Sequence, residues 1–211
     1  SFLNLASSCM YPKDLVQPLS EDMLFTGLLE PTNEGYAIAK LAVTKLCEYV
    51  TNEMPEFLYK TLIPCNLYGK YDNFSYSSSH MIPGVIRRIH DAKITNVDHI
   101  LIWGDGQARR EFMYAGDFAN FIFFAIESFD RIPQNLNVGL GYDFSIKEYY
   151  KIIADEIGFD GKFRHDYDRP IGMKQKLLNI QALLDLGWKH ELSVKQGIKE
   201  TYQFFLESHN A

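Results

Sequence analysis

The 211-residue sequence has no stretch of about 18 or more consecutive apolar residues, which is the length that a helix needs to cross a membrane. Its most apolar segment, Phe118–Phe124, is too short and is soon followed by Glu127. The three cysteines, at positions 9, 47 and 65, form neither an even disulfide set nor a C-x-x-C metal pair. These absences argue against a membrane protein and against a disulfide-stapled secreted domain, and they favour a reduced, cytoplasmic setting.

Two further features are missing. No G-x-G-x-x-G or G-x-x-G-x-x-G loop precedes the first candidate catalytic groups, so we expect the glycine loop that holds a dinucleotide pyrophosphate to be absent from this sequence. A basic surplus is absent as well, since the formal net charge is −6. Nucleic acid is therefore not the expected partner, and any attraction for a phosphate must be local.

What the sequence does contain is enough apolar material for a folded core. Hydrophobic residues make up 46% and aromatic residues 14% of the chain, which makes disorder improbable. Strand-like and helical segments alternate along it, and this order predicts an α/β fold: the C-terminal part of a doubly wound, Rossmann-type parallel sheet plus a smaller α/β substrate-binding domain. The expected strands are Phe2–Ala6, Leu58–Ile63, Val97–Trp103, Leu136–Val138 and Lys162–Asp166.

The expected helices have recognisable ends. A capping box formed by Ser145 and Glu148 begins a helix that ends near Gly158, and Asp117 is expected to cap a helix that reaches about Phe129. Between the elements, Asn66–Gly69 is expected to be a loop. The remaining expected helices are Glu34–Met54, Pro83–Asp91, Ile180–Leu186 and Ser193–Glu207.

Four polar groups near the N-terminal end suggest chemistry on a carbonyl: Ser7, Cys9, Tyr36 and Lys40. The Tyr-x-x-x-Lys spacing is weak evidence alone, because the chain has 13 tyrosines. Its place is informative, however, since both residues fall in the first turns of a predicted helix and Ser7 follows a predicted strand, where α/β sheets bind ligands. The apolar face of this helix is expected to consist of Ile38, Leu41, Ala42, Leu46 and Val50.

These groups have complementary chemistry. An ammonium such as Lys40 lowers the cost of ionising a neighbouring phenol, so Tyr36 becomes a candidate proton donor and acceptor. Ser7 can hold the substrate oxygen by a hydrogen bond. Such a trio polarises a carbonyl that accepts hydride, and in reverse it assists oxidation of an alcohol.

Many short motifs, taken in order, resemble the GDP-L-fucose synthases, the bifunctional epimerase/reductases of the extended short-chain dehydrogenase/reductase family. The resemblance covers essentially the whole chain, and an ordered series of motifs is more specific than any one of them. The segments that carry it are Ser7–Lys13, Glu30–Lys40, Pro64–Gly69, Asp72–Phe74, Ser79–Pro83, Arg87–Arg88, Trp103–Gly106, Arg110–Phe112, Lys176–Leu178 and Leu186–Trp188.

The resemblance implies an NADPH-dependent conversion of GDP-4-keto-6-deoxymannose to GDP-L-fucose. Cys9 and His80 match the family's cysteine and histidine, which exchange protons at C3 and C5 of the keto sugar. Tyr36 would then protonate the C4 oxygen as hydride arrives, and Lys40 would also bind the nicotinamide ribose. The catalytic set implied in this way is Ser7, Cys9, Tyr36, Lys40 and His80.

The binding residues implied by the resemblance fall into two overlapping groups, and no metal is expected. Arginine engages diphosphates bidentately, lysine adds a point charge and tryptophan offers a face to a base or ribose. The neighbouring Arg87 and Arg109 are expected to be solvated surface charges. For the NADPH cofactor the matching residues are Tyr36, Lys40, Pro64, Asn66, Leu67 and His80. For the GDP-linked keto-deoxy sugar they are Asn66, Met81, Arg88, Trp103, Arg110 and Lys176.

The domain division follows from the same comparison. Residues 1–70 are expected to form the C-terminal part of the NADP-binding domain, and residues 71–211 mainly the GDP-sugar domain, with segments near 110–140 returning to the Rossmann sheet. The first strands and helices of the family's sheet are expected to be missing. A homodimer is the expected assembly.

Alternatives remain open at this stage. Cys9 alone is compatible with a small core residue, and His80 with a helix N-cap. A related enzyme that acts on GDP-keto-heptoses, as epimerase or as reductase only, fits the same motifs, and Ser75–Ser78 is where such a change of substrate would lie. A truncated, non-catalytic module that binds GDP-sugars is the alternative of another class.

Overall fold

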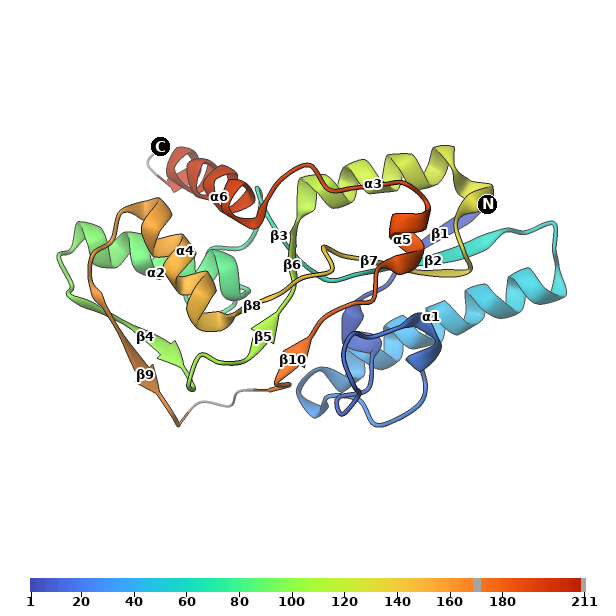
Figure 1. The fold of residues 1–211 in the computed structure, drawn as a ribbon, viewed down its shortest axis with the longest axis horizontal. Helices are drawn as coiled ribbons and strands as arrows, with labels where there is room; N and C mark the ends of the chain where they lie inside the picture. Colours follow the sequence, from blue (N-terminus) through green and yellow to red (C-terminus); the bar gives the residue numbers. More distant parts are fainter. Residues whose placement is uncertain (169–171, 210–211) are drawn as a thin grey trace.

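A parallel three-stranded sheet organises one half of the molecule in the computed structural model, which describes residues 1–168 and 172–209 (Figure 1). Its order is β1 (Phe2–Leu5), β2 (Tyr59–Pro64) and β7 (Asn135–Val138). The central strand β2 pairs on both sides, with Leu62 opposite Leu5 and Leu136, and is buried almost throughout. The strand buries even its polar side chains, and each has a hydrogen-bond partner: Lys60 donates to the Ile132 carbonyl and Thr61 accepts from Asn4.

Helices lie on both sides of this sheet, as the doubly wound prediction requires. In Figure 1, α1 (Glu34–Glu53) runs along one side and α3 (Ala115–Glu127) along the other, with α5 (Gln181–Asp185) beside β7. The connection from β1 through α1 to β2 joins two neighbouring parallel strands. This arrangement brings the C-terminal ends of β1 and β2 to the same edge.

Of the predicted buried face of α1, Leu41 is buried and Val50 half-buried, and the other three positions are exposed. The face turned inward consists instead of Ala37, Leu41, Thr44 and Cys47, while Ile38 is 53% and Leu46 58% exposed. Polar Thr44 is buried because its hydroxyl has partners: it accepts from Asn4 at 3.4 Å and donates to the Lys40 carbonyl at 3.0 Å. The inward face of α1 is therefore determined by hydrogen bonding between β1 and α1 and not only by the pattern of apolar residues.

The other half is built around a second pair of parallel strands and three helices. Strand β4 (His99–Trp103) pairs with β9 (Lys162–Asp166), and α4 (Ile146–Ile157) packs against α2 (Met81–Ile94) and α6 (Val194–His209). The predicted capping box is confirmed: Ser145 Oγ accepts from Glu148 N, and the Glu148 side chain accepts from Ser145 N. The helix ends at Gly158, whose φ of 73° favours glycine.

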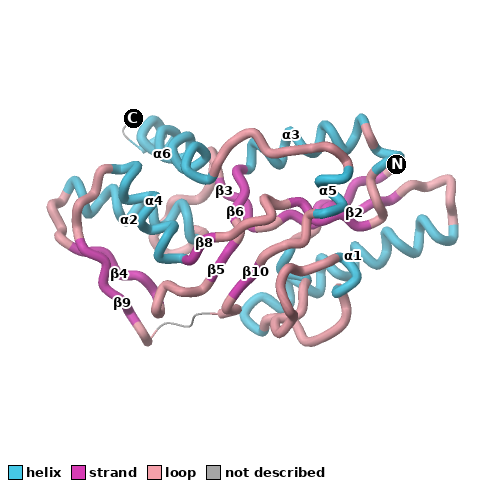
Figure 2. Tube along the Cα trace, viewed as in Figure 1, coloured by secondary structure: helices cyan, strands magenta, loops and turns pink. Residues whose placement is uncertain are grey.

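Short strands join the two halves (Figure 2). Strand β3 (Asn66–Tyr68) pairs with β6 (Phe112–Tyr114), so the loop predicted for Asn66–Gly69 is largely a strand. Three residues are too few for a recognisable alternation. The second junction has two residues per strand: β5 (Arg109–Arg110) lies between β10 (Gln175–Lys176) and β8 (Phe144–Ser145).

Asp117 does not cap α3, contrary to the prediction. The helix begins two residues earlier, and the buried Asp117 carboxylate accepts hydrogen bonds from the backbone of Glu191 at 3.2 Å and Leu192 at 3.1 Å. It therefore fastens the segment before α6 to the start of α3. Elsewhere in the described residues, three-residue 3-10 helices lie at Ser8–Met10, Glu21–Met23, Pro31–Asn33 and Phe129–Arg131.

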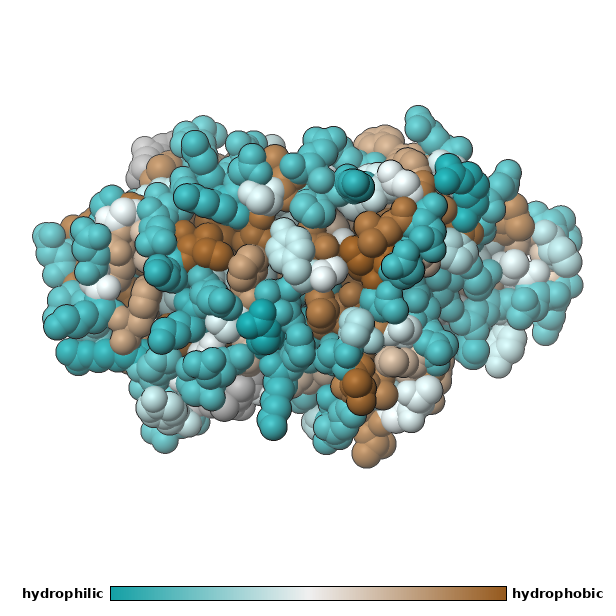
Figure 3. Space-filling view, viewed as in Figure 1, coloured by the Kyte–Doolittle hydropathy of each residue, from teal (hydrophilic) through white to brown (hydrophobic). Residues whose placement is uncertain are grey.

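The outer surface is mixed. Figure 3 shows a face that is largely hydrophilic, with hydrophobic side chains gathered in patches near its middle. Within residues 1–168 and 172–209, no helix combines the length and the apolarity that a membrane span needs.

Candidate active site

A cavity of about 610 Å³ lies where β1 and β2 end, and we call it the catalytic cavity. Such a volume is in the range of small-ligand sites. It brings together residues from the N-terminal strand, α1, the β2–β3 region and the start of α2. Its lining consists of Ala6, Ser7, Cys9, Asn33, Tyr36, Pro64, Cys65, Asn66, Leu67, His80, Met81, Arg110, Phe112 and Ile146.

Ser7 and Cys9 are presented to this cavity by a single helical turn. Ser7 is extended, with φ −161° and ψ 146°, and its Oγ accepts a hydrogen bond from Cys9 N at 3.2 Å. The following residues anchor the turn, since Met10 and Tyr11 are buried and the Tyr11 hydroxyl donates to Asn137 Oδ1 at 2.7 Å. Cys9 is half-buried and faces the cavity, so it is not the small core residue of the alternative interpretation.

Tyr36 and Lys40 lie one turn apart on α1, as predicted. The Lys40 ammonium donates to the Leu5 carbonyl at 2.8 Å and lies 5.7 Å from the centre of the Tyr36 ring. Tyr36 lines the catalytic cavity, whereas Lys40 lies beside it, against the end of β1. The ammonium therefore ties the helix to the strand that carries Ser7.

A second cavity of about 270 Å³ adjoins the first, and we call it the binding cavity. It shares His80, Met81, Arg110 and Ile146 with the catalytic cavity. Its other lining residues come from the 76–79 loop, α2, the end of β4 and α4: Tyr76, Ser77, Ser79, Gly84, Arg88, Trp103, Gly106, Ala108 and Tyr150. The shared residues make the two cavities neighbouring parts of one site.

The Arg88 guanidinium is held inside the binding cavity by hydrogen bonds and by aromatic contacts. Its Nε donates to the Gly84 carbonyl at 3.2 Å, and its Nη2 donates to the Tyr150 hydroxyl at 2.9 Å. The Trp103 ring lies 5.9 Å from the guanidinium carbon, within cation–π distance. A fixed guanidinium next to an indole suits a ligand that combines an anionic group with a flat ring.

Arg110 is the second cation of the binding cavity. Its Nη1 donates to the Arg109 carbonyl at 2.8 Å. Burial lowers the pKa of Arg110, while attraction to Cys9 and Glu30 acts in the opposite direction. An arginine stays protonated in proteins, so this partly dehydrated cation is prepared to bind an anion.

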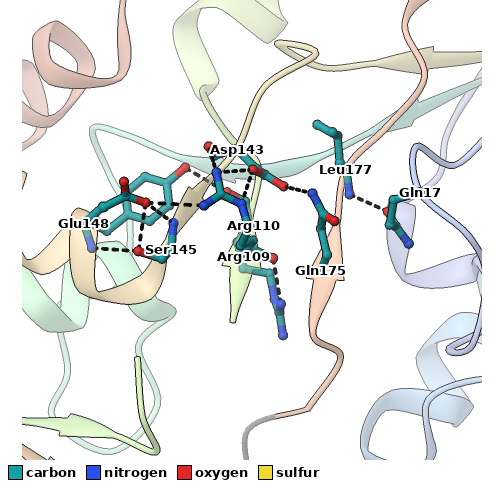
Figure 4. A network of polar contacts seen from close by, with 9 residues as sticks. Gln17, Arg109, Arg110, Asp143, Ser145, Glu148, Gln175 and Leu177 are labelled. Carbon is teal, nitrogen blue, oxygen red and sulfur yellow. Dashed lines mark hydrogen bonds and ion pairs between the residues drawn. The ribbon is translucent and has the colours of Figure 1, made fainter. Parts of the chain in front are cut away.

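Arg87 and Arg109 were predicted to be solvated charges, and both are ion-paired, although the Arg109 side chain stays 42% exposed. Arg87 Nε donates to Asp91 Oδ2 at 2.7 Å and its guanidinium lies 5.1 Å from the Tyr76 ring centre. Arg109 donates from Nε to the buried Asp143 carboxylate at 2.7 Å (Figure 4). Each arginine thus stabilises an element next to the cavities.

His80 stands at the junction of the two cavities. It occupies the N-cap position of α2, but its side chain makes no capping hydrogen bond, so the capping interpretation is not supported. The side chain is 80% exposed, and its Nδ1 lies 3.8 Å from Asp72 Oδ1. An accessible imidazole with a carboxylate nearby suits proton exchange.

Asn66 and Lys176 complete the predicted set. The Asn66 side-chain amide donates to the Glu111 carbonyl at 2.9 Å, which fixes its orientation in the catalytic cavity. Lys176 is not among the residues that line the binding cavity with Arg88 and Trp103, and its Nζ is 3.4 Å from Cys9 Sγ. The structure therefore brings it to the catalytic groups.

Two residues that support the site, Tyr150 and Glu111, carried no recognisable signal in the sequence. Tyr150 holds Arg88 from α4, but a tyrosine in an amphipathic helix resembles an ordinary core residue. Glu111 belonged to a quoted motif without an assigned role. It is fully buried and accepts backbone hydrogen bonds from Leu140, Gly141 at 2.8 Å and Leu178 at 3.0 Å. Burial raises the pKa of Glu111 to about 7, and these donors act in the opposite direction.

The family model described as the NAD dependent epimerase/dehydratase family matches residues 1–139. The chain belongs to this family. Among curated relatives of the family, the GDP-L-colitose synthase of Yersinia pseudotuberculosis is 55% identical over 208 residues, covering 99% of this chain and 68% of that protein. The GDP-L-fucose synthase of Azorhizobium caulinodans is 48% identical over 206 residues, covering 98% of this chain and 66% of that protein. These matches confirm the resemblance to the GDP-L-fucose synthases.

Solved structures give the same result for the fold. The GDP-mannoheptose C4 reductase of Campylobacter jejuni, solved with NADP bound, superposes with a TM-score of 0.85 at 28% identity, covering 96% of this chain and 69% of that one. The predicted α/β fold with a Rossmann-type parallel sheet is therefore confirmed. The chain spans about two thirds of the length of the relatives that it matches.

Proposed function

We propose that this protein takes part in the NADPH-dependent epimerisation and reduction of a GDP-4-keto-6-deoxy sugar, with GDP-4-keto-6-deoxymannose as substrate and GDP-L-fucose as product. The observation that carries the proposal is the junction of the two cavities at His80, Met81 and Arg110. Acid–base groups and fixed cations thereby border one continuous site. The names of the curated relatives support the choice of sugar nucleotide.

The GDP part would occupy the binding cavity. Arg88 and Arg110 would engage the diphosphate, and Trp103 would lie against the base or ribose. Met81 borders both cavities, so it would separate the nucleotide from the sugar. Tyr76 and Ser77 also line the binding cavity, so the segment expected to distinguish substrates borders the proposed ligand.

The catalytic cavity fits the nicotinamide end of the cofactor. Its lining includes Tyr36, Pro64, Asn66, Leu67 and His80, which combine apolar surface with hydrogen-bonding groups. Lys40 lies directly beside it, against Leu5. NADPH, when bound, supplies the hydride that reduces C4.

The residues of this chain supply the proton transfers. Hydrogens at C3 and C5 are acidic because the C4 ketone stabilises the resulting carbanion as an enolate. Cys9 and His80 would exchange these protons on opposite faces of the sugar. Ser7 would hold the C4 oxygen by a hydrogen bond, and Tyr36 would donate its phenolic proton to that oxygen during reduction, with Lys40 stabilising the tyrosinate.

The test separates the two half-reactions. The protein is incubated in deuterated water with NADPH and GDP-4-keto-6-deoxymannose, and NADPH oxidation is followed together with deuterium entry at C3 and C5. Tyr36→Phe should lower the reduction rate by about 10²–10⁴-fold while exchange stays measurable. Cys9→Ser should slow exchange. Full exchange in Cys9→Ser would return Cys9 to a structural role.

Two alternative products have specific support. The 55% identity to a GDP-L-colitose synthase favours GDP-L-colitose as the second candidate, and the fold match to a GDP-mannoheptose reductase keeps the heptose alternative. Product identification by NMR with each GDP-keto sugar distinguishes them. If GDP binds but no GDP-keto sugar supports exchange or NADPH oxidation, the protein is a non-catalytic GDP-sugar-binding module.

The domain division and the assembly belong to the same proposal. Residues 1–70, with segments near 110–140, would serve the cofactor, and the rest of 71–211 mainly the GDP-sugar. A cytoplasmic homodimer is the proposed form, and the exposed apolar positions Ile38, Leu46 and Tyr49 on α1 are its candidate interface. Light scattering should give the mass of a dimer for the native protein and a monomer for Leu46→Glu; a native monomer contradicts the assembly.

A further inference from the structure

Lys176 and Cys9 form a contact that joins sequence positions 167 residues apart. The Lys176 Nζ lies 3.4 Å from Cys9 Sγ, which is hydrogen-bonding distance for a sulfur acceptor. Lys176 is half-buried, at the end of strand β10. The ammonium therefore faces the residue that the proposed function uses for proton exchange.

The backbone that carries Lys176 is anchored on both sides. Within the β10–β5 pair, Lys176 lies opposite Arg110. The preceding Gln175 donates to the buried Asp143 carboxylate at 2.6 Å, and the following Leu177 N donates to Gln17 Oε1 at 2.9 Å (Figure 4). The next amide, Leu178 N, donates to the buried Glu111. These hydrogen bonds fix the backbone on both sides of Lys176, and they therefore limit the positions that its ammonium group can reach.

Cys9 differs from the other two thiols in its surroundings. Burial raises the pKa of the Cys65 thiol, and burial also raises the pKa of Cys47. Cys9 is half-buried and lies near two cations, because Lys176 contacts its sulfur and Arg110 interacts with it electrostatically. Cationic neighbours favour a thiolate, which is the reactive form of cysteine.

We propose that Lys176 is a positioning residue: its ammonium contacts Cys9 Sγ and stabilises the thiolate form in which Cys9 removes the proton from the sugar carbon next to the ketone. In that step the C–H bond breaks and its proton forms an S–H bond. The electron pair forms a C=C bond as the carbonyl π pair moves to the C4 oxygen. This inference rests on the proposed epimerisation and adds a role for Lys176 within it.

The competing role for Lys176 is the one that the family resemblance implies, a point charge for the GDP diphosphate. The two roles differ in what they affect. A diphosphate ligand changes GDP affinity and leaves the free thiol unaffected. A thiolate partner changes the reactivity of Cys9 before any substrate binds.

The experiment compares Lys176→Met and Lys176→Arg with Lys174→Met, which removes the same charge from an exposed lysine of the same segment. Alkylation of Cys9 by iodoacetamide is followed by peptide mass spectrometry at one neutral pH. Deuterium exchange at C3 and C5 and calorimetric GDP binding are measured on the same proteins.

Lys176→Met should slow the alkylation of Cys9 by about tenfold or more, and it should slow deuterium exchange at least as much. GDP affinity should change by less than about twofold. Lys176→Arg should restore most of both rates, and Lys174→Met should match the native protein.

The proposal is overturned if Lys176→Met alkylates at the native rate, and all the more if its GDP affinity falls about tenfold. Thermal unfolding identifies a variant that fails to fold. If Lys176→Met fails to fold, the comparison of Lys176→Arg with the native protein tests the proposal instead. An arginine variant in which Cys9 is unreactive would contradict a role based on positive charge. Failure of the proposed function is recognised separately. The native protein would then show no exchange with any GDP-keto sugar, while the alkylation comparison still tests the Lys176–Cys9 pair.

Discussion

Glu111 should make the stability of the fold depend on pH near neutrality. Its carboxyl group is fully buried and links three separate segments through the backbone amides of Leu140, Gly141 and Leu178. Burial raises its pKa from 4.5 to about 7. A carboxyl group with a raised pKa in the folded state keeps its proton where the unfolded chain has already released it. The folded state therefore loses stability as pH rises through this interval.

The expected magnitude follows from the two pKa values. At about 1.4 kcal/mol per pKa unit, the interval from 4.5 to about 7 corresponds to a loss of about 3 kcal/mol in the free energy of unfolding. The contribution of Glu111 to the free energy of unfolding is fully present below pH 4.5, declines between pH 4.5 and about 7, and is lost above that pH. A loss of this size is a large share of the stability of an ordinary domain.

Urea unfolding across this pH range, on the native protein and Glu111→Gln, measures the effect. The glutamine cannot ionise, so the difference in unfolding free energy between the two proteins isolates Glu111 from all other titrations. We expect the native protein to lose about 3 kcal/mol relative to the variant between about pH 4.5 and 7.5. Glu53→Gln, at an exposed position at the end of α1, should give a flat difference. A flat difference for Glu111→Gln as well would refute the reasoning.

Two smaller changes test the binding cavity and its supporting helix. Tyr150→Phe removes the hydroxyl that accepts from Arg88 at 2.9 Å, so GDP affinity measured by calorimetry should fall about three- to tenfold through a loss of about 1 kcal/mol; unchanged affinity would remove Arg88 or Tyr150 from the nucleotide site. Ser145→Ala breaks the capping box of α4 and should lower the free energy of unfolding by about 1 kcal/mol in urea. Lys147→Ala, at an exposed position two residues after Ser145, is its control, and equal losses in both would show that the cap is not the cause.

Local chemistry explains which parts of the fold were predictable. The capping box at Ser145 and the glycine at position 158 predict where α4 begins and ends, because both features depend only on residues close by in the sequence. The short, mostly apolar segments before Ser7 and up to Pro64 do form the parallel strands β1 and β2, and the ends of these strands place Ser7, Pro64 and Asn66 around one cavity. The N-terminal half of the site therefore follows from strand ends.

Parts that depend on distant partners were not predictable. The inward face of α1 includes Thr44, which is buried because Asn4 and Met10 contact its hydroxyl. Arg109 was expected in solvent, and its partner Asp143 is 34 residues away. Two-residue strands such as β5 and β10 have no periodicity of their own, and they exist only because the junction between the two halves pairs them.

The same distinction separates the two proton-transfer groups of the site. Tyr36 and Lys40 belong to one helix, so their proximity follows from a spacing of four residues. It does not depend on how α1 packs against the rest of the protein. Cys9 and Lys176 meet only because β10 pairs with β5 and because Glu111, Gln17 and Asp143 hold the segment around it. In the proposed mechanism, reduction would therefore depend on a local pair, whereas epimerisation would depend on the junction between the two halves. A perturbation of that junction, such as loss of the Glu111 anchor, should for this reason slow exchange at C3 and C5 more than reduction at C4.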